Sequence, residues 1–427
     1  MLFNQRIRDW RLLRAERLLS TAPRRALALF VAAAVDDAEA AFRAGTCYAE
    51  GNGAPVHLFE AARWFRLAAE AGHERAQFRL AELHLAGVPE QATLFPSNGL
   101  FETGVTGEAD YHASLPWARR AAESGAADAQ ALLGFIFSSG PPGLRDAGTG
   151  LDWYRRSAEQ DFPAGCLGYG ITLLAQADGG ADNTKIACAR RQMLRAAEAG
   201  LPTAHYMLGI IAEMGVGTAR DEAEARASYH VAAVAGQSKA QARLGAMLLE
   251  GRGGPADRLN GETWLRRAVL GGAPEAALRL GAIYIQDHNG VEAVRWYELA
   301  AQAGEAQAQA ALAGLYLSGQ GVVRDHQTAK FWLLRAAEAE HPGAMYGLGV
   351  LHAGGYDIVP DAAQARHWLA EAANRDHPLA ALVLARFFLH GVGGAVDVAA
   401  ARRSYARAIQ LGASGAAAEL ARCLQAK

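Results

Sequence analysis

The residues best suited to chemistry in this sequence are its histidines, its serines and its glycine-rich turns. Thirteen histidines are scattered along 427 residues without an HExxH motif or a similar metal-ligand spacing. No serine lies in a GxSxG nucleophile elbow. The turns Gly215-Val-Gly217 and Gly319-Gln-Gly321 complete neither GxGxxG nor a Walker motif, so they predict no phosphate site. We therefore predict no catalytic residue, no metal, no cofactor and no small-molecule ligand.

The four cysteines form no chemical motif either. Cys47, Cys166, Cys188 and Cys423 contain no CxxC pair and no regular framework. Cys166 and Cys188 are expected at opposite ends of one helical hairpin, too far apart for a disulfide. We expect buried structural thiols, in a reducing compartment or in a protein indifferent to redox conditions.

The overall composition argues against nucleic acid as a partner and against insertion into a membrane. The net charge of −2 and the pI near 6.7 give no bulk attraction to nucleic acid or to an anionic membrane. No apolar run approaches the ~18 residues of a transmembrane helix, so no membrane insertion is expected.

One repeated pattern organises the chain, and residues 293–304 show it most clearly: Ala-Val-Arg-Trp-Tyr-Glu-Leu-Ala-Ala-Gln-Ala-Gly. Seven of the eight tryptophans occupy the same place in this pattern: Trp64, Trp117, Trp153, Trp264, Trp296, Trp332 and Trp368. Eight residues after each comes a glycine or an acidic residue. Three further units without the tryptophan end at Gly200, Gly236 and Gly412, and with these included most consecutive ends are 36 residues apart. Such regular spacing indicates an internal repeat.

Each repeat is expected to contain two amphipathic helices joined by a glycine turn. A Leu-Gly pair such as Leu280-Gly281 marks the first helix, and apolar residues three and four apart mark both helices. Left-handed C-caps are predicted at Gly51, Gly87, Gly140, Gly215, Gly251, Gly319, Gly355 and Gly391. N-caps of the second helix are predicted at Asp221, Asp257, Asp325, Asp361 and Asp397. The tryptophan is expected to fill the space between neighbouring helices.

The pattern Leu-Gly-x-x-Tyr, a glycine turn, a capping Asp and Ala-x-x-Trp-Tyr-x-x-Ala-Ala-x-x-Gly resembles the Sel1-like repeat, a relative of the tetratricopeptide repeat. The resemblance covers about residues 38–427. It implies an all-α fold, a right-handed α-solenoid of stacked antiparallel helical hairpins. It also implies a protein that scaffolds other proteins rather than one that catalyses.

Three regions are predicted. Residues 1–36 form an N-terminal capping hairpin, a degenerate repeat in which Leu29 and Ala33 pack under the next repeat. The alternative for this region is a cleaved signal, because Arg24-Arg25 precede an apolar stretch that ends at Val35. Residues 37–412 hold about ten repeats, and residues 413–427 form a C-terminal capping helix.

An insertion without helical period, residues 88–107, interrupts the second repeat. Long loops in compact repeats are often functional. Two apolar pairs flank a tight Asn-Gly turn there, and we predict that they bind a partner together with a groove on the first helices. The predicted partner-binding residues are Leu94, Phe95, Leu100, Phe101, Phe135 and Ile136. The alternative is that the insertion only packs against the repeats.

The predicted function is a non-enzymatic scaffold or adaptor that binds another protein through the concave face and the insertion. The predicted compartment is the cytoplasm. Two alternatives follow from the resemblance: a periplasmic scaffold of an exopolysaccharide assembly or export machine, and a hydrolase like the cysteine-rich penicillin-binding relatives. The second lacks the cysteine framework and a nucleophile motif here.

Overall fold

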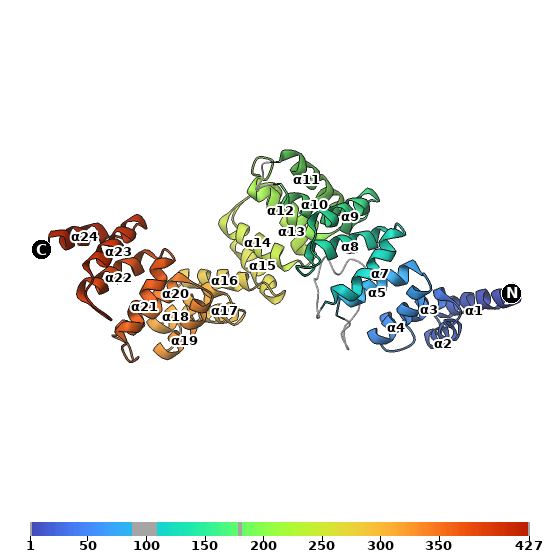
Figure 1. Cartoon of the computed structure of the whole chain (residues 1–427), viewed down its shortest axis with the longest axis horizontal. Helices are drawn as coiled ribbons and strands as arrows, with labels where there is room; N and C mark the ends of the chain where they lie inside the picture. Colours follow the sequence, from blue (N-terminus) through green and yellow to red (C-terminus); the bar gives the residue numbers. More distant parts are fainter. Residues whose placement is uncertain (1, 88–108, 178–181, 426–427) are drawn as a thin grey trace. The chain divides into compact units, whose positions relative to one another are not determined.

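The structure is a computed structural model that describes residues 2–87, 109–177 and 182–425. All regular elements in these ranges are α-helices, which confirms the all-α class (Figure 1). The chain divides into two compact units, unit 1 with Met1–Ala235 and unit 2 with Gly236–Lys427.

Most of the helices have 12 or 13 residues, and most are joined by short turns. Unit 1 contains α1 (Leu2–Leu18), α2 (Pro23–Ala33), α3 (Ala38–Glu50), α4 (Leu58–Glu70), α5 (Glu74–Leu85), α7 (Tyr111–Glu123), α8 (Ala127–Ser139), α9 (Ala147–Glu159), α10 (Pro163–Ala175), α11 (Asn183–Glu198), α12 (Pro202–Met214) and α13 (Glu222–Val234). Unit 2 contains α14 (Ser238–Glu250), α15 (Arg258–Leu270), α16 (Pro274–Gln286), α17 (Gly290–Gln302), α18 (Ala306–Ser318), α19 (His326–Glu338), α20 (Pro342–Ala353), α21 (Ala362–Asn374), α22 (Pro378–His390), α23 (Val398–Gln410) and α24 (Ala416–Gln425).

The helices pack in pairs, as in a TPR-like solenoid. A first helix and a second helix form each hairpin: α3–α4, α5–α7, α8–α9, α10–α11 and α12–α13 in unit 1, and α14–α15, α16–α17, α18–α19, α20–α21 and α22–α23 in unit 2. Within each unit the second helix also packs on the first helix of the next repeat. Each hairpin therefore shares its apolar surface with its neighbours.

In the turn between the two helices of a hairpin, one aspartate forms hydrogen bonds with both helices. Its side chain caps the second helix, and its backbone N–H donates to a carbonyl of the first. The carboxylate of Asp325 accepts the backbone N–H groups of Gln327 and Thr328 at 2.9 and 3.1 Å. Its own N–H donates to the carbonyl of Tyr316 at 3.1 Å. The carboxylates of Asp221, Asp257, Asp361 and Asp397 cap α13, α15, α21 and α23 in the same way, which confirms the predicted N-caps.

The predicted turn glycines have positive φ, with one exception. Gly319, for example, has φ 74° and ends α18 in the left-handed conformation. Gly140 was predicted to do the same, but it is extended, with φ −64° and ψ 176°. Pro141 follows it, and proline disfavours helical backbone at the preceding residue.

The interior of each hairpin is filled by the residue after the tryptophan place, not by the tryptophan. Tyr229 is fully buried, and a Cβ added to Gly209 would lie 2.5 Å from its ring. Leu265 lies against Gly245 in the same way. The buried residues at this place are Phe65, Tyr154, Met193, Tyr229, Leu265, Tyr297, Leu333, Leu369 and Tyr405. The glycine of the Leu-Gly pair is thus the residue that lets the second helix approach.

The seven repeat tryptophans are half-buried, and they do not fill the interior of their own hairpin. They bridge repeats instead. Trp332 packs against the hydrophobic cluster of Leu312 and Tyr297 and also against that of Leu333 and Leu348. An arginine covers the outer face of several rings: Arg120, Arg156 and Arg267 lie 4.9, 4.4 and 4.8 Å from the ring centroids of Trp117, Trp153 and Trp264.

The turn between repeats needs left-handed backbone at the place where each repeat ends. Gly304 has φ 95° there. Asp161, Glu340 and Asp376 occupy the same place with φ of 58°, 58° and 63°. Each of these three acidic side chains forms an ion pair with an arginine of the next repeat: Arg195 with Asp161, Arg375 with Glu340 and Arg407 with Asp376.

Residues 2–33 form a two-helix hairpin, α1 and α2, which packs on α3. Ala26 and Phe30 of α2 are fully buried in one cluster with Ala15 of α1 and Cys47 of α3. Within the described part of the chain, no helix is both long enough and apolar enough to span a bilayer.

Candidate protein-binding face

The sequence predicted that Phe135 and Ile136, the two residues after Leu133-Gly134, would line a groove, and the structure separates them. Equivalent pairs follow Gly209, Gly245 and Gly349. The second member is core: Ile136, Ile211, Met247 and Leu351 are at most 2% exposed. Ile136 lies in a cluster with Leu132 and Leu133, so its predicted contact with a partner is not available at this surface. Phe135, the first member, is half-buried.

A row of apolar side chains follows this first position across three consecutive first helices of unit 1. Phe135 on α8, Ile171 on α10 and Ile210 on α12 form it, and we call it the apolar row. Ile171 is 39% exposed. Met214, one turn beyond Ile210, is 70% exposed. The row therefore offers apolar surface that the fold does not bury.

Charges are few on the helices that carry the row. Asp128 and Glu213 are the only charged residues of α8, α10 and α12, and both are acidic. Glu213 accepts the phenol hydroxyl of Tyr229 at 2.7 Å. On α5 the position equivalent to Phe135 holds Glu82. Burial raises the pKa of Glu82 to about 7, although its 2.8 Å ion pair with Arg79 opposes the shift.

Ile171 was missed by the sequence analysis because the Leu-Gly pair of its repeat, Leu167-Gly168, lies two residues before the equivalent place. Tyr169-Gly170 stands in that place, and a Cβ on Gly170 would lie 3.1 Å from Met193 of α11. A signal was present, since Gly170 lies 36 residues after Gly134. The other predicted binding residues, Leu94, Phe95, Leu100 and Phe101, lie outside the described residues, and that part remains a prediction.

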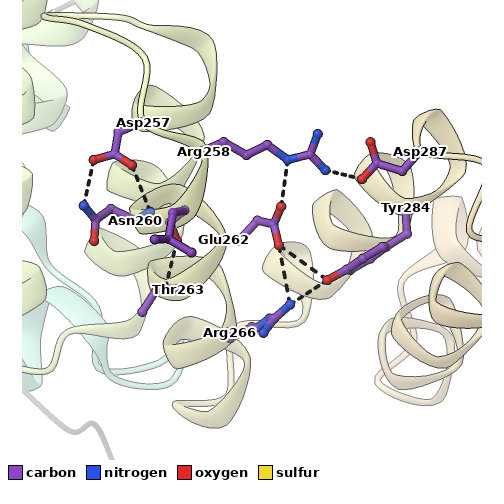
Figure 2. Close-up of polar contacts among 9 residues, drawn as sticks. Asp257, Arg258, Asn260, Glu262, Thr263, Arg266, Tyr284 and Asp287 are labelled. Atoms are coloured by element: carbon purple, nitrogen blue, oxygen red, sulfur yellow. Dashed lines mark hydrogen bonds and ion pairs between the residues drawn. The ribbon is translucent and has the colours of Figure 1, made fainter.

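In unit 2 the equivalent positions are small or polar except for Val350, and a polar cluster joins α15 to α16 and to Asp287, just after α16 (Figure 2). Glu262 accepts Arg258 Nε at 2.9 Å and Arg266 Nη2 at 3.4 Å. Arg266 also donates to the hydroxyl of Tyr284 at 2.5 Å, and Arg258 pairs with Asp287. Arg258 holds the pKa of Asp287 below its usual range.

This polar cluster is suited to fixing helices rather than to catalysis. Asp287 stays ionised because of the guanidinium of Arg258, and an ionised carboxylate cannot act as a general acid at neutral pH. Glu262 already accepts from two arginines and from Tyr284 Oη, at 3.4 Å. The cluster therefore contains neither an activated nucleophile nor a carboxyl group poised near neutral pH.

Other sites for small ligands are poor. The described residues contain no group of three or more His, Cys, Asp or Glu side chains able to hold a metal ion. A surface cavity of about 660 Å³ lies beside Tyr111, His112 and Arg145. Asp110 in its wall is occupied as the N-cap of α7. Burial raises the pKa of the Cys47 thiol to about 11, which makes it unreactive at neutral pH.

Ten stretches of the chain match the Sel1 repeat family: residues 38–73, 74–92, 99–125, 127–162, 202–233, 238–272, 274–305, 306–341, 342–377 and 378–412. This chain belongs to the Sel1 repeat family. The hairpin α10–α11, residues 163–198, lies outside these Sel1 matches, yet it packs like the others. Its second helix has 16 residues, whereas most of the others have 13.

Solved structures with the same repeats are similar to this Sel1 repeat protein. A protective antigen of uropathogenic Escherichia coli that displays an SLR fold is 26% identical, with a TM-score of 0.63, over 92% of this chain and 81% of that chain. A Sel1 repeat protein from Oxalobacter formigenes is 26% identical, with a TM-score of 0.48, over 57% of this chain and 96% of that chain. A search of curated proteins gave no match. Sel1 and TPR-like folds commonly serve as protein-interaction scaffolds, and the family is generally non-catalytic.

Proposed function

We propose that this Sel1 repeat protein is a non-enzymatic scaffold that holds a partner protein on the apolar row. The observation that carries the proposal is the row itself, Phe135, Ile171 and Ile210 at one repeat position on three successive first helices. Phe135 and Ile210 are each followed by a buried isoleucine, Ile136 and Ile211, so these two side chains are held on a rigid surface. Preorganised apolar side chains lose little conformational entropy on binding.

The proposal is tested by placing charges on the row. In the double variant Ile171→Asp/Ile210→Asp, capture of a partner from a native extract should be lost, and the purified partner should bind roughly tenfold or more weakly. The matched control is Leu259→Asp/Leu270→Asp in unit 2, where the two leucines are 79% and 89% exposed. Partner affinity that is equal in the row variant and the control would refute the proposal.

The predicted contribution of residues 88–107 to binding is tested separately. Replacing residues 89–108 by a short Gly-Asp turn should weaken partner capture without changing the melting temperature if the insertion binds. A large drop in melting temperature with unchanged capture would show that the insertion serves only packing.

We also propose that the protein acts in the cytoplasm with residues 1–36 attached. The buried side chains of Ala26 and Phe30 support this, because their removal would expose apolar surface of α3. Mass spectrometry of the native protein should find a peptide that begins before Arg24. A mature protein that begins near Val35 would refute it and favour the periplasmic alternative.

A further inference from the structure

Over the described side chains of α1, from Trp10 to Leu18, one face is not used to build the fold. Ala15 is fully buried, and Leu12 and Leu18 pack with it against the cluster that contains Phe30. The opposite face carries Trp10, Leu13, Arg14 and Arg17. Trp10 and Leu13 are each 56% exposed. These four residues are spaced i, i+3, i+4 and i+7, so they form one continuous stripe on the helix.

The stripe belongs to a strongly basic part of the chain. Arg11, Arg14 and Arg17 of α1 are exposed, and so are Arg24 and Arg25 where α2 begins, directly after the turn that follows α1. We call the stripe and the other exposed arginines, Arg11, Arg24 and Arg25, the basic end. α1 is marked as the N-terminal helix in Figure 1.

The net charge of the whole protein does not reveal that positive charge is concentrated in the first 25 residues. Residues 1–25 carry seven arginines against Asp9 and Glu16, which gives +5. Since the full chain carries −2, the remaining residues carry −7. Glu16 is already paired with Arg43 of α3 at 3.1 Å. The basic end is therefore a local source of positive potential on an otherwise acidic protein.

We propose that the basic end docks on the surface of an anionic phospholipid membrane. The carboxylate- and phosphate-rich headgroup layer attracts arginines, and the attraction grows with each arginine within a Debye length of the surface. Trp10 and Leu13 supply apolar contact beside these charges, and an indole ring with polar neighbours suits the headgroup boundary. The guanidinium of Arg14 lies 5.0 Å from the Trp10 ring, which keeps charge and indole on the same side.

The test uses the full-length protein and co-sedimentation with vesicles. The protein should bind vesicles of phosphatidylcholine mixed with phosphatidylglycerol, should not bind pure phosphatidylcholine, and should be released by salt. In the variant Arg14→Gln/Arg17→Gln, affinity should fall on the order of 25-fold, about fivefold for each arginine. Arg14→Lys/Arg17→Lys keeps both charges and should bind like the parent.

The matched control is Arg402→Gln/Arg403→Gln on α23, which removes two exposed arginines from unit 2 and should leave vesicle affinity unchanged. Circular dichroism checks that the helical content of each variant is intact. Equal binding to neutral and anionic vesicles, or equal loss in the control, would overturn the proposal. So would binding to polyglutamate without binding to anionic vesicles, because that result would assign the basic end to an acidic protein.

Discussion

The ring of Tyr297 lies against the Cα atom of Gly281, so closely that a Cβ on this glycine would come within 2.6 Å of the ring. Tyr297 comes from the second helix α17 and Gly281 from the first helix α16 of the same hairpin. The contact sets how closely the two helices approach. It gives a physical reason for a glycine in the interior of a helix, where glycine itself is unfavourable.

Gly281→Ala should lower the free energy of unfolding by about 1–3 kcal/mol, the usual effect of overpacking a tight core. The control is Gly314→Ala on α18, where nothing lies within 4 Å of an added Cβ and the helix should gain up to about 1 kcal/mol. Urea denaturation measures both changes. Gly281→Ala as stable as the parent would show that the helices can separate without cost.

Leu333→Ala and Trp332→Ala should destabilise the protein in different ways. Leu333 is buried in one hairpin, and its truncation should cost about 2–5 kcal/mol. Trp332 is half-buried but packs on the clusters of two repeats, so its truncation should cost less and should weaken coupling between them. Calorimetry should therefore show a broader unfolding transition for Trp332→Ala. The control is Phe331→Ala, because the Phe331 side chain is 51% exposed. A transition equally sharp for all three would contradict the bridging role.

Gly304→Ala should lower the free energy of unfolding by about 1 kcal/mol, because φ is 95° there and nothing lies within 4 Å of an added Cβ. The cost would come from the backbone alone. Glu340→Gly at the equivalent place should relieve left-handed strain but lose the 2.9 Å ion pair with Arg375. Because exposed ion pairs contribute little, the net change should be stabilising. A neutral Gly304→Ala would mean that this turn tolerates an L side chain without strain.

Acid should destabilise unit 2 through two histidine caps. Nδ1 of His341 and of His377 each accepts a backbone N–H at 3.1 Å, at the start of α20 and of α22. Burial lowers the pKa of both, and for His377 the nearby His341 adds to the shift. A protonated imidazole cannot accept this hydrogen bond. Groups near the caps include Glu340, Arg375 and Asp376, which are engaged in ion pairs.

The direction of the pH effect on stability follows from the lowered pKa of the two histidines in the folded state. The unfolded pKa of histidine is about 6.5, so the caps contribute fully above that pH and are lost as the pH falls through the lower folded value. The urea midpoint should therefore fall as the pH is lowered below about 6.5. His341→Asn/His377→Asn keeps a cap that does not titrate and should remove this part of the pH dependence. His367→Asn on an exposed position is the control, and an unchanged pH dependence in the double variant would exclude the caps.

The sequence by itself determined the repeat, its two helices and its caps, because these depend on residues a few positions apart. Asp325 and Gly319 fix one turn through backbone hydrogen bonds and a positive φ, and both were predictable from local chemistry. The same local reasoning was wrong at Gly140 because it ignored the proline that follows.

Tertiary structure decided which of two adjacent apolar residues is buried. Phe135 and Ile136 are both apolar and neighbours in sequence, and a helix needs two buried faces in a stack, so periodicity does not separate them. The helices of the adjacent repeat cover Ile136 and leave Phe135 half-exposed. Likewise, Trp296 and Tyr297 are consecutive aromatics, and only the close approach of Gly281 shows that Tyr297 fills the hairpin. The surface available to a partner is what remains after each repeat has packed against its neighbours, and no single repeat contains that information.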